Sequence, residues 1–483
     1  MIRPDFDNPV MPAEPPKPTH ILDTLPQVLR RNYDQWADEA AMSRKRTVTW
    51  QKYFWRVYYD TARQLSLGLI SQGLKRGDVV AIIGEKSPEW YWSELGVQAA
   101  GGIAAAIPSN AAPADIKYIL VQCNAKFVIV SSTEQMAKFS GIRSELPALK
   151  KIVSWDPGAL KNTNDPLLIS FNDMLALGAE HDKTNLNLFK QNIYNGTGGD
   201  TAVIYYSTSG PDGLPKGISL THDALLNAAR GFLSRFPVQG EDNLISNFPI
   251  GVDDSCFTVV PNLITGANLN LPAKAETLLQ DTRQIKPNGV VYSPQQWEKL
   301  AAGIQDAIKT ANPVSRFFYN LLLPVGYKFA DAKIKNKKPD IFSRMLKVPA
   351  SMLVFRPLRN KLGLIKVRLA ASNGPLQSPD AFRLLHAVGI ELRHAYAIPE
   401  VGLVACQRQD DIDFATVGPP ALNTEVKITD RGEMLVRGKS MFEGYYNNPE
   451  KTAAVLIDGW YHTGISAGIN EKGHLAIMDR KKT

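Results

Sequence analysis

Apolar and polar positions follow two patterns along this chain. Continuous apolar runs, such as Val79–Ile83 and Phe127–Val130, predict strands that are covered on both faces. Between them, Trp55–Gly73 and Trp90–Ala100 carry apolar residues at helical spacing. Strands that alternate with helices predict a doubly wound α/β sheet, and the pattern recurs after residue 200.

The two ends of the chain have a different character. Prolines at positions 4, 9, 12, 15, 16 and 18 remove backbone donors, so residues 1–20 are expected to form an extended tail. Residues 21–415 carry the α/β pattern. From 416 to 478, short strands such as Val426–Ile428 and Met434–Arg437 predict a small β-rich unit.

Length and composition limit the class of protein. The 483 residues exceed the ~250–300 at which single cores stop growing. Only three cysteines occur, none in a C-x-x-C spacing, which argues against a disulfide framework or a cysteine zinc site and fits a reducing, cytoplasmic setting. The first 20 residues lack the apolar core of a secretory signal. No apolar run of 18 residues occurs, so we expect no membrane span.

Residues 309–361 form a cationic segment. They hold twelve lysines and arginines against Asp331 and Asp340, a local excess of +10, while the whole chain carries +8. One interpretation is a set of packed helices with a solvated cationic face. The other is a basic amphipathic surface on an anionic membrane. Charge alone, without a motif, predicts no nucleic-acid partner. The apolar residues expected to insert are Phe317, Phe318, Tyr319, Leu322 and Phe355.

A glycine-rich string is the strongest local motif. Residues Thr208–Gly217 follow the apolar run Ala202–Tyr206 and precede a helix that we expect to begin near Thr221–Asp223. A glycine-rich loop between a strand and a helix presents backbone N–H groups to phosphates. The spacing differs from that of a Walker loop. The candidate phosphate-binding residues are Thr208, Ser209, Gly210, Gly213 and Lys216.

Further strings follow in a fixed order. They are Tyr396–Glu400, Gly432–Gly438, Gly444–Glu450, Trp460–Ile465 and Asp479–Lys482. Together with the glycine-rich string, they resemble the motifs of the AMP-forming, or adenylate-forming, acyl-CoA synthetase superfamily. Leu323–Lys328 and Phe355–Gly363 resemble its long-chain fatty acid–CoA ligase branch.

This resemblance implies a fold and a reaction. The fold is the large domain of an adenylate-forming enzyme, with two doubly wound α/β subdomains and a small β-rich subdomain. Residues 479–483 would be a hinge stub, and the family's small C-terminal domain is absent from the sequence given. The family joins a carboxylate to ATP-Mg, and CoA then displaces AMP. ATP or AMP, Mg and CoA are therefore the implied cofactors, with a long-chain acyl ligand.

The resemblance also assigns roles to single residues. Lys216 falls in the phosphate loop, and Glu400 matches the Mg²⁺ ligand. Tyr396 is placed to stack on the adenine base, and Gly374 lies in the glycine turn of the acyl pocket. Arg480 belongs to the hinge string and is expected to contact the nucleotide.

Five positions depart from the family pattern. Pro211 and Asp212 replace two threonines of the phosphate loop. The Asp212 carboxylate would repel a nucleotide phosphate there, and such a like-charge pair at about 4 Å costs on the order of 4 kcal/mol. Alternatively, this stretch is simply a stable turn. Pro399 replaces a phosphate-contacting threonine, and Val252 a pocket histidine. Ile465 replaces the aspartate that holds both ribose hydroxyls through bonds of roughly 1.5–3 kcal/mol each.

Three functions remain open at this point. The chain is an active ligase with divergent motifs, a split enzyme completed by a separate C-terminal domain, or a pseudoenzyme that keeps the fold. The five departures favour the third, because an added domain repairs none of them. A pseudoenzyme is expected to bind an acyl ligand or a protein partner, with a peripheral position on the membrane.

Overall fold

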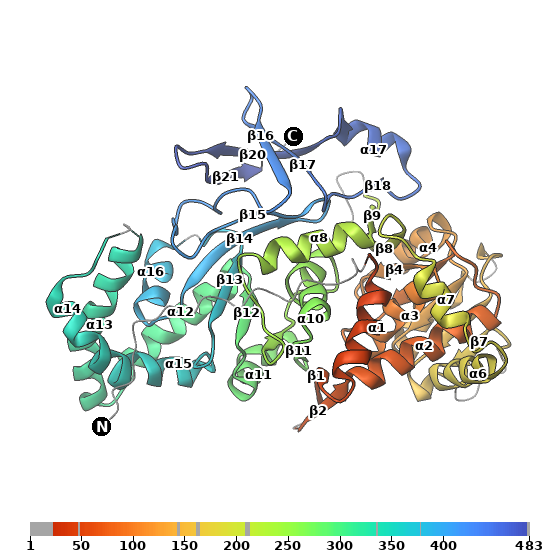
Figure 1. Ribbon diagram of the computed structural model, residues 1–483, viewed down its shortest axis with the longest axis horizontal. Coiled ribbons are helices and arrows are strands. Elements are labelled where there is room, and N and C mark those ends of the chain that lie inside the picture. The colour runs from red at the N-terminus through yellow and green to blue at the C-terminus, as the bar shows by residue number, and fades with distance from the viewer. Residues whose placement is uncertain are drawn as a thin grey trace.

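The computed structural model describes residues 23–46, 49–142, 145–160, 165–207, 213–334, 337–376 and 378–480. Two eight-stranded sheets lie side by side, and a smaller sheet lies above them in Figure 1. The predicted tail 1–20, the motif residues 208–212 and residues 481–483 lie outside the described ranges. Within those ranges no helix is both long and apolar enough to cross a bilayer.

The first sheet is parallel at its centre and buried on both faces. On β3, Val80 and Ile82 join one core cluster, while Val79, Ala81 and Ile83 join another on the opposite side. This explains why the strand reads as a continuous apolar run. The order is β18 (Gly444–Tyr445), β9 (Gly217–Thr221), β8 (Thr201–Tyr206), β4 (Ile103–Ile107), β3 (Val79–Ile83), β5 (Phe127–Val130), β6 (Lys151–Ser154) and β7 (Leu168–Ser170).

Helices cover both faces of this sheet. Thr24 caps the first helix by accepting a hydrogen bond from the Gln27 N–H, and Gly73, at φ +86°, follows the end of the second. The predicted bounds of the second helix, Trp55–Gly73, are therefore close to the observed ones. The helices are α1 (Leu25–Trp36), α2 (Trp55–Ser71), α3 (Pro88–Ala99), α4 (Pro113–Gln122), α5 (Thr133–Ser140), α6 (Phe171–Thr184) and α7 (Leu188–Tyr194).

The second sheet combines early and late parts of the chain. Its strands β1 and β2 precede the whole first sheet in sequence, yet β1 pairs in parallel with β11. Leu244 and Val291 face one core cluster, and Ile245 and Val290 face the other. The order is β15 (Gly402–Cys406), β14 (Leu392–Ile398), β13 (Leu369–Asn373), β12 (Gly289–Tyr292), β10 (Asn243–Ile245), β11 (Asn268–Leu271), β1 (Ala40–Arg46) and β2 (Thr49–Phe54).

Helix α8 (His222–Leu233) lies between the two large sheets and contacts both β9 and β15. The other helices of the second unit are α9 (Val252–Asp254), the π-helical turn η3 (Ser255–Val259), α10 (Val260–Thr265), α11 (Leu278–Ile285), α12 (Pro294–Lys309) and α16 (Pro379–Ala387).

The β-rich unit is a five-stranded sheet with one helix, α17 (Pro449–Val455). Its strands are β16 (Thr424–Ile428), β17 (Glu433–Gly438), β20 (Trp460–Ile469), β19 (Leu456–Ile457) and β21 (Leu475–Arg480). The short strand β18 leaves this unit and pairs with β9 of the first sheet. That pairing connects the β-rich unit to the glycine-rich hairpin.

The cationic segment folds into α13 (Pro313–Ile334), α14 (Ile341–Ala350), the π-helical turn η5 (Ser351–Phe355) and α15 (Arg356–Leu362). Leu322 and Phe355 are only 5% and 7% exposed and fill the core of the second unit. The prediction that these two side chains insert into a membrane is therefore wrong. Phe318 and Tyr319 also pack against that core, whereas Phe317 is exposed.

Candidate nucleotide site

The glycine-rich string connects two antiparallel strands. The Ser207 N–H donates to the Lys216 carbonyl at 2.9 Å, and the Lys216 N–H donates to Ser207 Oγ at 3.2 Å, which closes the β8–β9 hairpin. Gly213 has φ +74°, a conformation that favours glycine. Helix α8 begins at His222, within the predicted range Thr221–Asp223, but β9 lies between the loop and this helix, so the loop connects two strands and not a strand and a helix. The N-terminus of α8 does not follow this loop directly. Thr208, Ser209, Gly210, Pro211 and Asp212 lie outside the described residues.

Lys216 and Glu400, far apart in sequence, meet around Tyr445. The Lys216 ammonium lies 5.5 Å from the centroid of the Tyr445 ring, and the Tyr445 hydroxyl donates to Glu400 Oε1 at 3.0 Å. Burial, and next the Glu400 carboxylate, raise the pKa of Tyr445 well above its ordinary value. The β18–β9 pairing brings Tyr445 opposite Ile218. Sequence reasoning treated Tyr445 only as part of a scaffold string and missed this role.

The predicted adenine and acyl positions meet at the ends of β13 and β14. Gly374 has φ +105°, and its N–H donates to the Ala395 carbonyl at 2.6 Å. The Ala397 N–H donates to Asn373 Oδ1 at 3.3 Å. Tyr396 is half-buried and packs against the main core cluster, and Pro399 is exposed in the turn after β14. The strand ends thus bring these motif residues together.

Val252 starts the short helix α9 and is buried in the main core cluster. The next residue, Asp253, was not singled out from the sequence. Burial, and next the charge of Asp254, raise the pKa of its carboxyl to about 6, while a hydrogen bond with Asn373 opposes that rise. Its Oδ1 atom has no hydrogen-bond partner among the described side chains. The only sequence signal was an acidic pair directly after an apolar run.

Asp254 has a structural task by contrast. Its carboxylate accepts hydrogen bonds from the Tyr91 hydroxyl at 2.6 Å, Ser246 Oγ at 2.6 Å and Thr258 Oγ1 at 2.8 Å. The Lys86 ammonium fixes the same loop by donating to the Ser246 and Phe248 carbonyls at 3.1 and 2.5 Å. These bonds hold α9 in place and thereby fix where Asp253 lies.

The position predicted to hold the ribose is filled by apolar packing. Ile465 is 3% exposed and belongs to the main core cluster. Its backbone N–H donates to Thr463 Oγ1 at 3.0 Å. In the β20–β21 ladder Ile465 is paired with Arg480, so the hinge residue is opposite it in register. A buried isoleucine has no atom that accepts a hydroxyl hydrogen bond.

The metal and nucleotide do not fit these residues well. Among the described residues, no group of three or more histidine, cysteine or acidic side chains gathers as a ligand set. Glu400 is a single carboxylate and already accepts the Tyr445 hydroxyl. At the predicted ribose position, the side chain of Ile465 offers no acceptor for a hydroxyl hydrogen bond. The arrangement is a packed and hydrogen-bonded junction between sheets.

Small cavities accompany this junction. One lies beside Val252 and Cys256, and a second beside Phe232 and Phe257; each has a volume of about 10 Å³. A cavity of that size holds about one water molecule. They are apolar, so we regard them as packing gaps in the present conformation.

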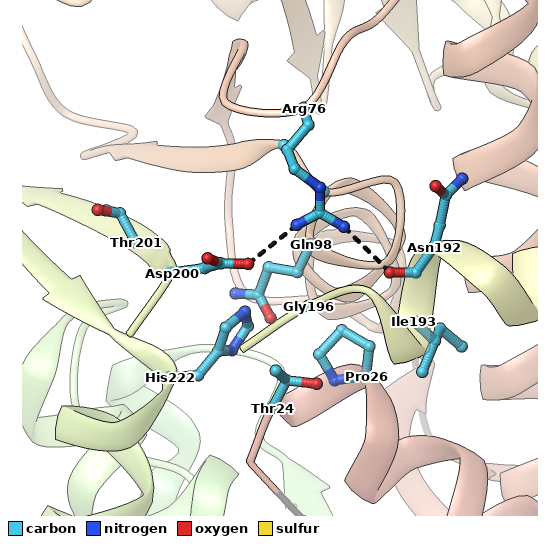
Figure 2. A pocket seen from close by; sticks show the side chains of 12 residues that line it. Thr24, Pro26, Arg76, Gln98, Asn192, Ile193, Gly196, Asp200, Thr201 and His222 are labelled. Carbon is cyan, nitrogen blue, oxygen red and sulfur yellow. Dashed lines mark hydrogen bonds and ion pairs between the residues drawn. The ribbon is translucent and has the colours of Figure 1, made fainter. Parts of the chain in front are cut away.

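A third cavity of about 10 Å³ is polar and lies near the start of α1 (Figure 2). Arg76 crosses it and donates to Asp200 Oδ2 at 2.9 Å and to the Asn192 carbonyl at 3.2 Å. The His222 ring also lines it; burial lowers the pKa of His222 to about 4, and its Nδ1 accepts the Leu25 N–H at 3.3 Å. The hydrogen bonds around this cavity link α1 to His222 of α8, and they link α7 to Asp200, which directly precedes β8.

A sequence profile of AMP-binding enzymes matches residues 29–446. The chain belongs to the AMP-binding enzyme family. The long-chain-fatty-acid–CoA ligase ACSBG1 of Rattus norvegicus is 26% identical over 481 residues, covering 96% of this chain and 65% of the relative. The chain thus spans less than two thirds of that relative's length. The predicted membership of the AMP-forming superfamily is confirmed, and this relative carries the name of a long-chain-fatty-acid–CoA ligase.

Two solved structures have the same fold as this AMP-binding family member. FadD1, a long-chain-fatty-acid-CoA ligase from Archaeoglobus fulgidus, superposes with a TM-score of 0.70 at 15% identity, covering 95% of this chain and 84% of that one. The N-terminal domain of FACL13 from Mycobacterium tuberculosis superposes with a TM-score of 0.63 at 19% identity, covering 94% and 100%. The predicted α/β large-domain fold is confirmed.

Proposed function

We propose that this protein is a catalytically impaired relative of long-chain acyl-CoA synthetases that keeps the large-domain fold and binds an acyl ligand or a protein partner. The observation that carries the proposal is Ile465, buried at the position where the family's aspartate holds ribose. The family cofactors ATP, Mg²⁺ and CoA are therefore not expected to support turnover here.

The charges around the site support the same proposal. The acidic residue Asp253 lies beside Asn373 at the end of β13, next to the predicted site residue Gly374, and there it would repel an anionic acyl-adenylate. At moderate screening, two like charges about 4 Å apart repel by on the order of 4 kcal/mol. Lys216, the cation that the motif supplies, lies over the Tyr445 ring. The cation is thus engaged by an aromatic ring, and carboxylates face the site.

The acyl ligand would lie in the apolar region next to Val252. The rings of Phe232 and Phe257 meet edge to face with centroids 5.2 Å apart and close this region. The adjoining cavities hold about one water molecule each, so a long acyl chain requires these rings to move. Phe257 lies on the π-helical turn η3, and such turns are frequent at functional sites.

Calorimetric titration with ATP-Mg and separately with AMP tests the proposal. The wild-type chain is expected to give no micromolar binding. The variant P211T/D212T/I465D restores the family residues and is expected to bind nucleotide more tightly. Thermal denaturation of the variant shows whether the new buried carboxylate is tolerated. The variant I465N supplies a hydrogen-bonding side chain without charge and is the matched control.

Micromolar binding of ATP-Mg by the wild-type chain would overturn the proposal in favour of an active ligase with divergent motifs. Turnover that appears only when a separate C-terminal domain is added would favour the split enzyme. As further parts of this proposal, the protein acts in the cytoplasm and at the periphery of an anionic membrane.

A further inference from the structure

Helix α14 presents an apolar stripe to solvent. Ile341, Met345 and Val348 are 76%, 73% and 64% exposed, and Met352 of η5 continues the stripe at 61%. Their spacing of four, three and four residues places them on one side of a helix. The opposite side holds Ser343 and Ala350, which are buried against the protein. The apolar side therefore faces away from the core.

This orientation is the reverse of an ordinary surface helix. A helix at the edge of a globular protein normally turns its apolar stripe inward and its polar side to water. Here the contacts of Ser343 and Ala350 fix the rotation of α14, and Asp340 caps its start by accepting the Ser343 N–H at 2.9 Å. Folding alone does not require large apolar side chains on the outer side. The exposed stripe therefore indicates an interaction surface.

Helix α13 carries a second stripe of the same kind. Val314, Phe317 and Leu321 are 67%, 62% and 56% exposed, while Leu322 and Val325 on the inner side are buried. Helices α13 and α14 pack together at one end of the long axis of the molecule (Figure 1). An ion pair between Lys328 and Asp340, 3.5 Å apart, joins the C-terminal half of α13 to the start of α14. We name these two stripes together the outer face.

Positive charge surrounds the outer face. Arg344 lies on α14 beside its stripe, Lys347 lies on the same helix with its ammonium over the Phe329 ring, Arg316 lies on α13, and Lys337 and Lys338 lie on the connection; all five are exposed. The two acids of the segment are both engaged. Asp331 pairs with Arg383 at 2.6 Å, and Asp340 pairs with Lys328. The acids of the segment therefore do not neutralise these exposed cations.

A cationic cleft opens next to the outer face. Its volume is about 530 Å³, and its lining includes Lys333, Lys337, Lys347 and Arg359. Glu391 and Asp410 also line it, and Lys333 pairs with Glu391 at 2.9 Å. The cleft thus has room and positive charge for polar headgroups beside an apolar surface.

We infer that the outer face docks on an anionic lipid bilayer, with the apolar stripes among the acyl chains and the surrounding cations at the headgroups. Apolar residues rimmed by lysine and arginine are the pattern of an interfacial helix. A second copy of this chain fits worse, because it would bring a segment of charge +10 against an identical one. The inference rests on the proposed peripheral location and names the surface responsible for it.

Co-sedimentation with vesicles tests the inference, without nucleotide or fatty acid. Phosphatidylglycerol vesicles are expected to pellet the protein at low salt, and phosphatidylcholine vesicles much less. The variant I341S/M345S/V348S removes the α14 stripe and is expected to bind at least tenfold more weakly. Its matched control, L186S/Y194S/L422S, changes side chains of similar exposure elsewhere, 74%, 58% and 54%, and is expected to bind like wild type.

Charge is tested separately. Each cation near an anionic surface contributes a factor of about five, so R316Q/R344Q is expected to bind roughly 25-fold more weakly. The control K183Q/K472Q removes two exposed lysines, 70% and 60% accessible, outside the segment and is expected to have a small effect. Raising the salt concentration should weaken wild-type binding steeply.

Three outcomes of the vesicle experiments overturn the inference. They are equal pelleting with both lipids, no pelleting with either, and unchanged binding of the natively folded stripe variant. A dimer in sedimentation velocity that the stripe variant abolishes would also overturn it, since a second copy would then cover the outer face. Vesicle binding with tight ATP binding would refute only the proposed catalytic impairment. Absent vesicle binding with absent nucleotide binding would refute only the docking.

Discussion

The hydroxyl of Tyr445 donates a hydrogen bond of 3.0 Å to the carboxylate of Glu400. Glu400 follows β14 in the second sheet, and Tyr445 lies on β18 in the first. The backbone strengthens the junction, because the Phe442 N–H donates to the Glu400 carbonyl at 2.8 Å. The residue that the family pattern assigns to a metal thus takes part in a bond that joins two sheets.

Removing the Tyr445 hydroxyl should destabilise the protein. We expect Tyr445→Phe to lower the free energy of unfolding by about 1.5–3 kcal/mol, because a half-buried carboxylate loses its donor. Glu400→Gln should cost less, since the amide oxygen still accepts. Urea denaturation of both single variants and of the double variant gives the coupling free energy between Tyr445 and Glu400. Strict additivity would show that the two side chains do not interact.

The chain should form no acyl-adenylate. With palmitate, ATP-Mg and hydroxylamine, we expect no acyl hydroxamate above a heat-denatured control, because Ile465 leaves the ribose without its carboxylate. Colorimetric detection of the hydroxamate is the measurement, and an active long-chain ligase serves as positive control. Hydroxamate above background would make the active-ligase interpretation the better one.

Glu94 should make stability depend on pH. Burial, and next the Asp254 charge, raise its pKa from 4.5 to about 8 in the folded protein. The folded state therefore holds a proton that the unfolded state releases, so this stabilisation is complete below pH 4.5 and is lost as the pH rises to about 8. We expect Glu94→Gln to flatten the pH dependence by up to about 1.4 kcal/mol per pH unit in that window.

Urea denaturation at several pH values inside this window measures the Glu94 effect. The comparison is between slopes, so contributions from other groups cancel. Glu89→Gln, on the same helix and outside the buried cluster, is the matched control. Parallel pH profiles for wild type and Glu94→Gln would contradict the assignment.

Lys45 and Asp281 form a buried ion pair. Their atoms Nζ and Oδ1 are 2.6 Å apart, and the side chains are 6% and 0% exposed. We expect Lys45→Met to cost about 3–5 kcal/mol, because Asp281 is left buried without its partner. Adding Asp281→Asn should recover part of the loss, since Asn still accepts from the Ala273 N–H. Thermal denaturation measures the stability of the single and the double variant. An equal loss of stability in the two variants would show that the unpaired charge of Asp281 is unimportant.

Two glycines should respond in opposite directions to alanine. A Cβ on Gly178 of α6 would lie 1.7 Å from the Gln64 carbonyl oxygen of α2, whereas one on Gly303 of α12 meets nothing within 4 Å. We expect Gly178→Ala to destabilise by about 3 kcal/mol or more. Gly303→Ala should stabilise by about 0.5–1 kcal/mol. If the melting temperatures of the two variants shift in the same direction, the close contact between α6 and α2 is contradicted.

Local periodicity was enough to predict much of the fold. Val79–Ile83 is a strand with the predicted bounds, and α2 begins at Trp55 as expected. These features depend on residues within a few positions of one another, which a sequence displays directly. The motif strings likewise fixed the family, because their order is a property of the chain. The strand between the glycine-rich loop and α8 was missed, since five apolar and small residues suit either a strand or a loop.

The sequence by itself determined many of the elements, the family and the positions that depart from the family pattern. The tertiary structure alone decided which distant side chains meet. The Tyr445–Glu400 bond needs the β18–β9 pairing, and the burial of Asp253 needs α9 to be held by the Asp254 network. It also decided which side of α14 faces the core. A helix with apolar residues on one side and Ser343 and Ala350 on the other can pack either way, and only the neighbouring helices fix its rotation.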